Sequence, residues 1–188
     1  MRTRALVVSI LGLTIVLDGV SGLPVLRAQD AGDSPWVAGV LESDRREALE
    51  RFRRGNAHLA EGQFAQALEH YERAISRWGH PTIRYNMVIC QVRLGRILEA
   101  HHSVERALRF GAAPLGDKHE HAVTYRQLLA GRVSQLTVSC VDPGTEVTLD
   151  GRAILRSPAE QTIVVLPGEH LVVASKPRHL TFTRKVVL

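Results

Sequence analysis

The sequence has 188 residues, of which 45% are hydrophobic and 5% aromatic, and its formal net charge is +5. This length and hydrophobic content are enough to bury a core in one domain or in two small ones. Most of the positive charge lies in residues 45–112, which hold 12 Arg and 7 Glu without forming a basic run. A solvated helix surface explains this pattern, and a nucleic-acid partner is not expected.

The first residues have the pattern of an export signal. Two arginines precede an uncharged apolar run over residues 5–17, which is shorter than the roughly 20 residues needed to cross a bilayer. We therefore expect residues 1–28 to be a secretory signal peptide that is cleaved after Ala28. Cleavage after Gly22 and retention as an anchor are the alternatives. The mature protein is then expected to be periplasmic or secreted.

Residues 29–43 contain Gln, Asp, Gly, Ser and Pro around an isolated Trp36. Such a composition predicts a linker. Ser43 or Asp44 is expected to cap the helix that follows.

Residues 55–75 set the pattern for the largest part of the chain. Apolar residues recur there at spacings of three to five, which is typical of an amphipathic helix. Gly62 interrupts the pattern and predicts two antiparallel helices joined by a short turn. The same order of small and large residues returns around Gly95, at an offset of 33 residues.

An internal period of this length, with small and large residues at these places, resembles the tetratricopeptide repeat (TPR). The resemblance covers about residues 45–112, and the second copy carries Tyr85-Asn86-Met87. It implies a scaffold of helical hairpins that binds a partner protein, in which Asn56 and Asn86 hydrogen-bond the backbone of a ligand. Phe52 stands where a basic residue is expected, so a clamp for a terminal carboxylate is not supported. The other groove-facing positions implied by the family pattern are Phe52, Leu59, Tyr85, Ile89 and Val92.

A further helix is expected over residues 117–133, with Asp117 as its cap. A repeat array needs its last apolar face covered, so this helix is predicted to close the array within residues 44–134. Two repeats and a cap offer a short groove, which favours modest affinity or dependence on oligomerisation. The apolar positions of the closing helix are Ala122, Tyr125, Leu128 and Leu129.

From Gln135 the apolar period changes to two, which is typical of strands. Strands are expected at about residues 136–141, 147–149, 162–166, 171–175 and 180–188. Asp150-Gly151 is a strong hairpin signal because both residues can adopt positive φ. Five or six short strands separated by turns predict a small antiparallel β-sandwich over residues 135–188, and an α+β fold for the whole chain.

The order Val-Asp-Pro-Gly-Thr-Glu-Val-Thr-Leu-Asp-Gly, then Ser-Pro, then Leu-Pro-Gly-Glu-His resembles the PEGA domain, a small β-module of bacterial envelope proteins. The resemblance covers about residues 135–188. Asp142-Pro143-Gly144-Thr145 stands where the module has Pro-Glu-Gly-Ala. The resemblance implies a place in the cell envelope.

Nine histidines raise the question of a metal site. The densest groups, His101-His102 and His119-Glu120-His121, are neighbours along predicted helices, where successive side chains diverge by about 100°. Metal ligands must converge on one point, so surface histidines are expected and no metal is predicted.

Other reactive side chains have simpler explanations. Asp142, Glu146 and Asp150 cluster near the predicted turns, where turn chemistry accounts for the aspartates. Cys90 is expected on a repeat helix and Cys140 on the inward face of a strand, so two buried thiols are favoured over a disulfide. We expect no catalytic residue, no cofactor and no enzymatic activity.

Three functions remain open from the sequence. The first is an exported, non-catalytic adaptor whose helical repeats bind a protein segment. The second is an envelope glycan or surface-polymer binder acting through residues 135–188, which contain one aromatic residue, Phe182. The third is a structural subunit of a larger envelope assembly.

Overall fold

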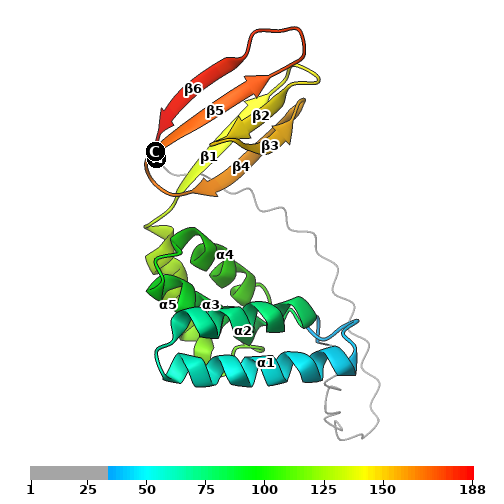
Figure 1. The fold of residues 1–188 in the computed structure, drawn as a ribbon, viewed down its shortest axis with the longest axis vertical. Coiled ribbons are helices and arrows are strands. Elements are labelled where there is room, and N and C mark those ends of the chain that lie inside the picture. Colours follow the sequence, from blue (N-terminus) through cyan, green and yellow to red (C-terminus); the bar gives the residue numbers. More distant parts are fainter. Residues whose placement is uncertain (1–33) are drawn as a thin grey trace, which may run out of the picture. The chain divides into compact units, whose positions relative to one another are not determined.

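The structure is a computed structural model that describes residues 34–188 (Figure 1). Five α-helices come first along the chain and six strands follow, so the predicted α+β fold class is confirmed. None of the helices in the described range is both long and apolar enough to cross a membrane. The predicted signal peptide over residues 1–28 and its cleavage after Ala28 lie outside the described residues.

The helical part consists of two hairpins and a fifth helix. Gly62 and Gly95 lie in the turns of the two hairpins with φ values of 72° and 73°, a left-handed conformation that glycine adopts without steric cost. These equivalent turns confirm the predicted internal repeat. The helices are α1 (Glu42–Ala60), α2 (Phe64–Arg77), α3 (Pro81–Arg93), α4 (Ile97–Leu108), a short 3-10 helix η1 (Gly116–Lys118), and α5 (His119–Ala130).

Two apolar clusters hold the helical part together. The first joins α1, α2 and α3 around Tyr71, which is fully buried. The second joins α3, α4 and α5, and it includes Val88 and Val104. Helix α5 contributes Ala122 and Leu129 to this second cluster. It therefore covers the apolar face of the second hairpin, as predicted for the end of a repeat array.

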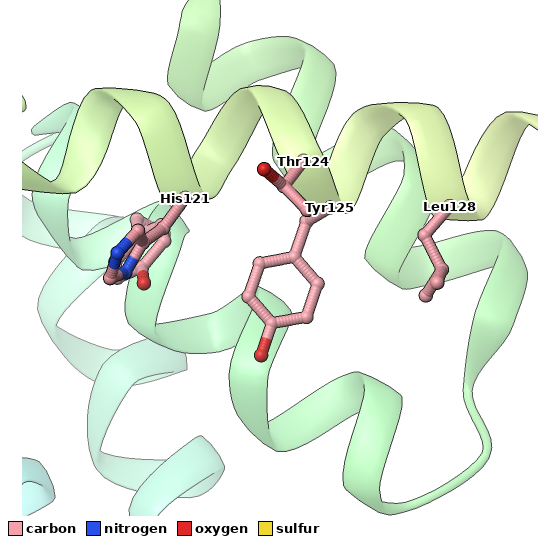
Figure 2. Close-up of a pocket in the computed structure, with 5 residues that line it drawn as sticks. His121, Thr124, Tyr125 and Leu128 are labelled. Carbon is pink, nitrogen blue, oxygen red and sulfur yellow. The ribbon is translucent and has the colours of Figure 1, made fainter.

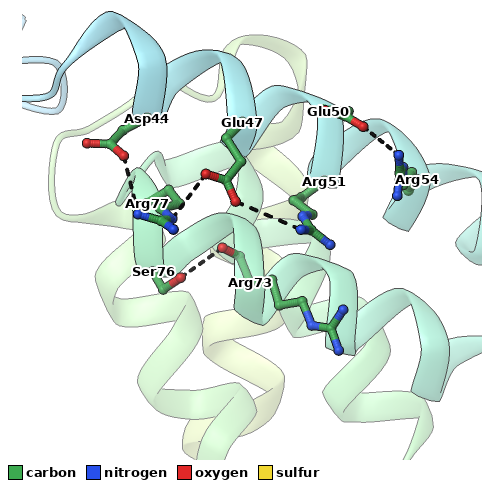
Figure 3. A network of polar contacts seen from close by, with 8 residues as sticks. All are labelled: Asp44, Glu47, Glu50, Arg51, Arg54, Arg73, Ser76 and Arg77. Atoms are coloured by element: carbon green, nitrogen blue, oxygen red, sulfur yellow. Dashed lines mark hydrogen bonds and ion pairs between the residues drawn. The ribbon is translucent and has the colours of Figure 1, made fainter.

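Ion pairs lie on the exposed side of α1 and α2 (Figure 3). Arg77 of α2 lies 3.6 Å from Asp44 and 3.3 Å from Glu47 of α1. Glu47 also lies 3.9 Å from Arg51, one turn further along α1. Exposed pairs of this kind contribute about 0–1 kcal/mol each. The apolar cluster is therefore the main source of stability in this hairpin.

Two predicted helix caps are wrong. Helix α1 begins before Ser43, with Leu41 at the N-cap position, so neither Ser43 nor Asp44 caps it. Asp44 lies in the first turn instead, where a carboxylate interacts favourably with the helix dipole. Asp117 does not cap α5 either. It lies inside the 3-10 helix η1, and α5 begins at His119 with Lys118 at its N-cap position.

Residues 34–40 pack on the helices and do not behave as a linker. The carbonyl oxygen of Trp36 accepts a hydrogen bond from Trp78 Nε1 at 2.7 Å. The Trp36 ring lies 5.8 Å from the ring of Phe110. The linker predicted over residues 29–43 therefore contains a segment that packs, partly buried, against the first apolar cluster.

The strands form two antiparallel sheets, with the orders β1-β4 and β3-β2-β5-β6. The pairing of β1 with β4 runs from Ser134 opposite Val165 to Cys140 opposite Ala159. All five strands that the sequence delimits are present, and β3 is an additional one. The strands are β1 (Ser134–Cys140), β2 (Glu146–Leu149), β3 (Arg152–Arg156), β4 (Ala159–Val165), β5 (Glu169–Ser175) and β6 (Phe182–Val187).

The two cysteines are unpaired. Cys90 of α3 is fully buried in the first apolar cluster, and this burial raises the pKa of its thiol to about 11. Cys140, at the end of β1, is only half-buried, which is less than its predicted inward position suggests. Both residues therefore act as small packing side chains in this structure.

The Asp150-Gly151 hairpin is confirmed, with φ values of 50° and 81° at the two residues. The Asp150 carboxylate connects this turn to β5. Its Oδ1 accepts a hydrogen bond from the backbone nitrogen of Leu171 at 2.9 Å, and its Oδ2 lies 2.7 Å from His170 Nδ1. The other ring nitrogen of His170, Nε2, lies 2.8 Å from the carbonyl oxygen of Leu166.

This geometry predicts how the protonation of His170 depends on pH. Both ring nitrogens face oxygen acceptors, so both hydrogen bonds form only when the ring is an imidazolium. The Asp150 carboxylate, followed by the Leu166 carbonyl, raises the pKa of His170 above its ordinary value of 6.5. We therefore expect an NMR titration of the His170 ring to give a midpoint above 6.5, and Asp150→Asn to lower it.

The same shift has a consequence for stability. The folded state holds the His170 proton more tightly than the unfolded state does. The protonated His170 therefore adds to the free energy of unfolding. This contribution is fully present below pH 6.5 and is lost as the pH rises through the raised pKa. His170→Gln should remove this loss from the curve of unfolding free energy against pH. His80→Gln is the comparison of opposite sign, since burial lowers the pKa of His80. A His170 midpoint at or below 6.5 would contradict the prediction.

Candidate partner-binding groove

The residues predicted to face a groove lie on α1 and α3. Phe52 of α1 is half-buried against the first apolar cluster, and its ring lies 5.7 Å from that of Tyr71. Tyr85 of α3 is buried in the second cluster. Packing therefore fixes the position of these side chains before any partner binds. Three more predicted positions are half-buried against the same clusters: Leu59, Ile89 and Val92.

Asn56 and Asn86 connect α1 directly to α3. Asn56 Oδ1 accepts hydrogen bonds from Asn86 Nδ2 and from the Tyr71 hydroxyl, both at 2.8 Å. Asn86 is only 7% exposed, so its amide nitrogen serves this internal contact. Asn56 is half-buried and uses its Oδ1 here, which leaves its Nδ2 outside the network. Of the two asparagines predicted to bind a ligand backbone, Asn56 is the better placed.

An open pocket of about 310 Å³ lies between α3 and α5 (Figure 2). Tyr85 comes from α3, and the remaining lining residues come from α5. The rings of Tyr85 and Tyr125 meet edge to face, with centroids 6.3 Å apart. Leu128 is 54% exposed at this surface. The residues that α5 contributes are His121, Thr124, Tyr125 and Leu128.

The pocket is suited to bind an apolar side chain, because its walls are apolar and a few polar groups lie at its border. Leu128 and the two tyrosine rings supply apolar surface, while His121 and Thr124 supply polar atoms. Burial raises the pKa of Tyr85, so its hydroxyl is neutral at physiological pH and can donate a hydrogen bond. Pockets that combine apolar walls with a few polar groups are typical binding sites.

Sequence reasoning missed the contribution of α5 to this surface. Helical spacing groups Tyr125 and Leu128 with Ala122 and Leu129 as apolar positions of a covering helix. The structure buries Ala122 and Leu129 completely but leaves Leu128 exposed. The missed signal is positional: α5 follows the second hairpin as the first helix of a third repeat would. Its outer apolar residues therefore extend the surface that begins on α3.

The two aspartates near the turns, Asp142 and Asp150, have structural partners. Asp142 lies 3.0 Å from Lys176 Nζ and accepts a hydrogen bond from the Thr145 hydroxyl at 3.2 Å. The hydrogen bond with Lys176 lowers the pKa of Asp142, so this carboxyl group stays ionised near neutral pH. Across residues 34–188, no group of three or more His, Cys, Asp or Glu side chains could hold a metal ion.

Comparisons with known proteins bear on the helical part. No curated protein matches the chain significantly. Among solved structures, the chain is similar to the second TPR of Spaghetti (RPAP3) bound to the HSP90 peptide SRMEEVD, with 20% sequence identity and a TM-score of 0.42. That similarity covers 48% of this chain and 82% of the other. The family model of the tetratricopeptide repeat matches residues 48–77, so the α1–α2 hairpin is similar to a tetratricopeptide repeat.

Proposed function

We propose that this protein is an exported, non-catalytic adaptor of the bacterial cell envelope that binds a segment of a partner protein. The pocket between α3 and α5 carries this proposal. Leu128 is exposed beside Tyr85 and Tyr125, and such an apolar surface gains stability when a partner's side chain covers it. The repeat in α1–α2 supports the proposal, because stacked helical hairpins present extended binding surfaces.

The envelope location rests on sequence features. The basic and apolar pattern of residues 1–17 is typical of an export signal. The turn and strand order of residues 135–188 resembles the PEGA module of envelope proteins. In this proposal, the β-strand part acts as a second contact or as a rigid spacer for the helical part.

Leu128→Glu is expected to weaken the binding of a partner segment at least about tenfold, because a charge buried against the tyrosine rings lacks a partner. The probe is a peptide selected on the full chain from a display library of random 12-residue sequences. Its dissociation constant is measured for the unchanged protein and for the variant. Glutamate is a good helix former, so the variant should keep the fold of α5.

Leu180→Glu is the matched control. Leu180 is 99% exposed in the β-strand part, so the same substitution there should change neither stability nor peptide affinity. If the peptide binds Leu128→Glu as tightly as the unchanged protein, the pocket is not the binding site. Loss of binding in Leu180→Glu alone would transfer the function to the β-strand part.

A second experiment separates a protein partner from an envelope glycan. The full chain is mixed with an insoluble bacterial envelope fraction, with and without prior protease treatment, and the sedimented protein is measured. Sedimentation that protease abolishes supports the adaptor. Sedimentation that survives protease but is lost in a Phe182→Ser variant would contradict it, since Phe182 is a 59% exposed aromatic residue on β6.

A further inference from the structure

A second open pocket, of about 480 Å³, lies where residues 34–40 meet the ends of α3 and α4. Arg84 belongs to the first turn of α3, Arg106 to the last turn of α4, and Arg109 follows α4 directly. All three line this pocket, together with the aromatic side chains of Trp36 and Phe110. We call it the arginine pocket. It shares no lining residue with the pocket between α3 and α5.

The arginines of this pocket differ from the six arginines of the helical part that pair with carboxylates. Within residues 34–188, none of the three forms an ion pair with a carboxylate. Arg84 is half-buried, and its guanidinium approaches the backbone at Gly79, where a Cβ added to the glycine would lie 3.9 Å from Arg84 Nη2. The helical arginines that do pair with carboxylates are Arg45, Arg51, Arg54, Arg73, Arg77 and Arg96.

Two of the charges in the arginine pocket, those of Arg84 and Arg106, repel each other. Burial, followed by the neighbouring Arg106, lowers the pKa of Arg84. Arg109 lies over the ring of Phe110, with its Cζ 5.4 Å from the ring centroid. This contact orients the guanidinium beside an aromatic wall. An anion in the pocket would relieve the repulsion and would accept hydrogen bonds from guanidinium groups.

The number of cations indicates which anion fits best. Three guanidinium groups balance a phosphate monoester, with a charge near −2 and three terminal oxygens, better than a single carboxylate. The half-buried rings of Trp36 and Phe110 add a flat apolar surface next to these cations. We propose that the arginine pocket binds a phosphate monoester whose organic part lies against these two rings.

The test uses phenyl phosphate and inorganic phosphate as probes of the full chain, with affinity measured by isothermal titration calorimetry. Phenyl phosphate is expected to bind saturably and more tightly than inorganic phosphate. Arg106→Gln and Arg109→Gln should each reduce its affinity about tenfold or more, because each removes a charge-assisted hydrogen bond. Both residues are exposed, so these variants should fold normally.

Arg53→Gln is the charge-matched control, because Arg53 is exposed on α1 outside the pocket, and this variant should bind phenyl phosphate normally. An equal loss in the control would show a non-specific charge effect and overturn the proposal. Undetectable binding to the unchanged protein would also overturn it. Equal affinities for phenyl phosphate and inorganic phosphate would overturn the role of the aromatic wall.

Vesicles that contain phosphatidic acid identify the source of the phosphate group. Sedimentation of the unchanged protein with them, lost in Arg106→Gln, supports a lipid headgroup as the ligand. Binding of phenyl phosphate without sedimentation supports a soluble ligand. The Leu128→Glu variant should bind phenyl phosphate normally, so this proposal and the proposed adaptor function succeed or fail separately.

Discussion

Gly55→Ala is expected to lower the free energy of unfolding by about 1–3 kcal/mol. This direction is unusual, because alanine is normally favoured over glycine inside a helix by about 1 kcal/mol. A Cβ at position 55 would lie 2.5 Å from Cε1 and 2.8 Å from Cδ1 of Tyr71. The Tyr71 ring is fully buried and packs against Phe52, so it cannot move aside without disturbing the first apolar cluster.

Urea unfolding of the full chain, followed by circular dichroism, measures this effect. Gly131→Ala is the control, because position 131 follows α5 and the nearest atom to a new Cβ is the Leu128 carbonyl oxygen at 3.8 Å. That variant should be neutral. In a Tyr71→Leu background the ring is absent, so Gly55→Ala should no longer destabilise the protein. A neutral Gly55→Ala in the unchanged background would contradict the close packing of α1 on α2.

The elements that the sequence predicted well depend on local signals. The turns at Gly62 and Gly95 need a left-handed backbone, and the equivalent patterns around them support each other. The Asp150-Gly151 hairpin is likewise set by two adjacent residues. Helix starts were predicted less well, because a polar residue such as Ser43 or Asp117 near a helix start is compatible with several cap positions.

The features that the sequence did not reveal depend on distant contacts. Trp36 appeared isolated in a polar segment, and its partner Trp78 is 42 residues away along the chain. Leu128 fits the apolar pattern of α5, but periodicity alone does not show which apolar residue a neighbouring helix covers. For the same reason, the pattern could not show that Asn86 is used inside the protein while Asn56 lies nearer the surface.

Trp78→Ala is expected to have the largest effect on stability, a loss of about 3–5 kcal/mol in the free energy of unfolding. Trp78 is 8% exposed and belongs to the first apolar cluster, so truncation removes many contacts and leaves a cavity. Its ring also lies 4.5 Å from that of His80 and 5.5 Å from Arg45 Cζ. Urea unfolding measures the loss, and a loss below about 1 kcal/mol would show that Trp78 does not anchor the cluster.

Trp78→Phe separates packing from hydrogen bonding at the same position. Phenylalanine keeps an aromatic ring in the cluster but cannot donate to the Trp36 carbonyl oxygen, and the loss of one hydrogen bond costs about 0.5–1.5 kcal/mol. Trp36 is then the only tryptophan in the chain, so its fluorescence reports on residues 34–40 alone. Acrylamide should quench the Trp36 fluorescence more strongly in Trp78→Phe than in a Trp78→His variant. The histidine ring keeps an N–H donor for the Trp36 carbonyl oxygen, whereas phenylalanine has none. Equal quenching would show that the contact with Phe110 is enough to hold the segment on the helices.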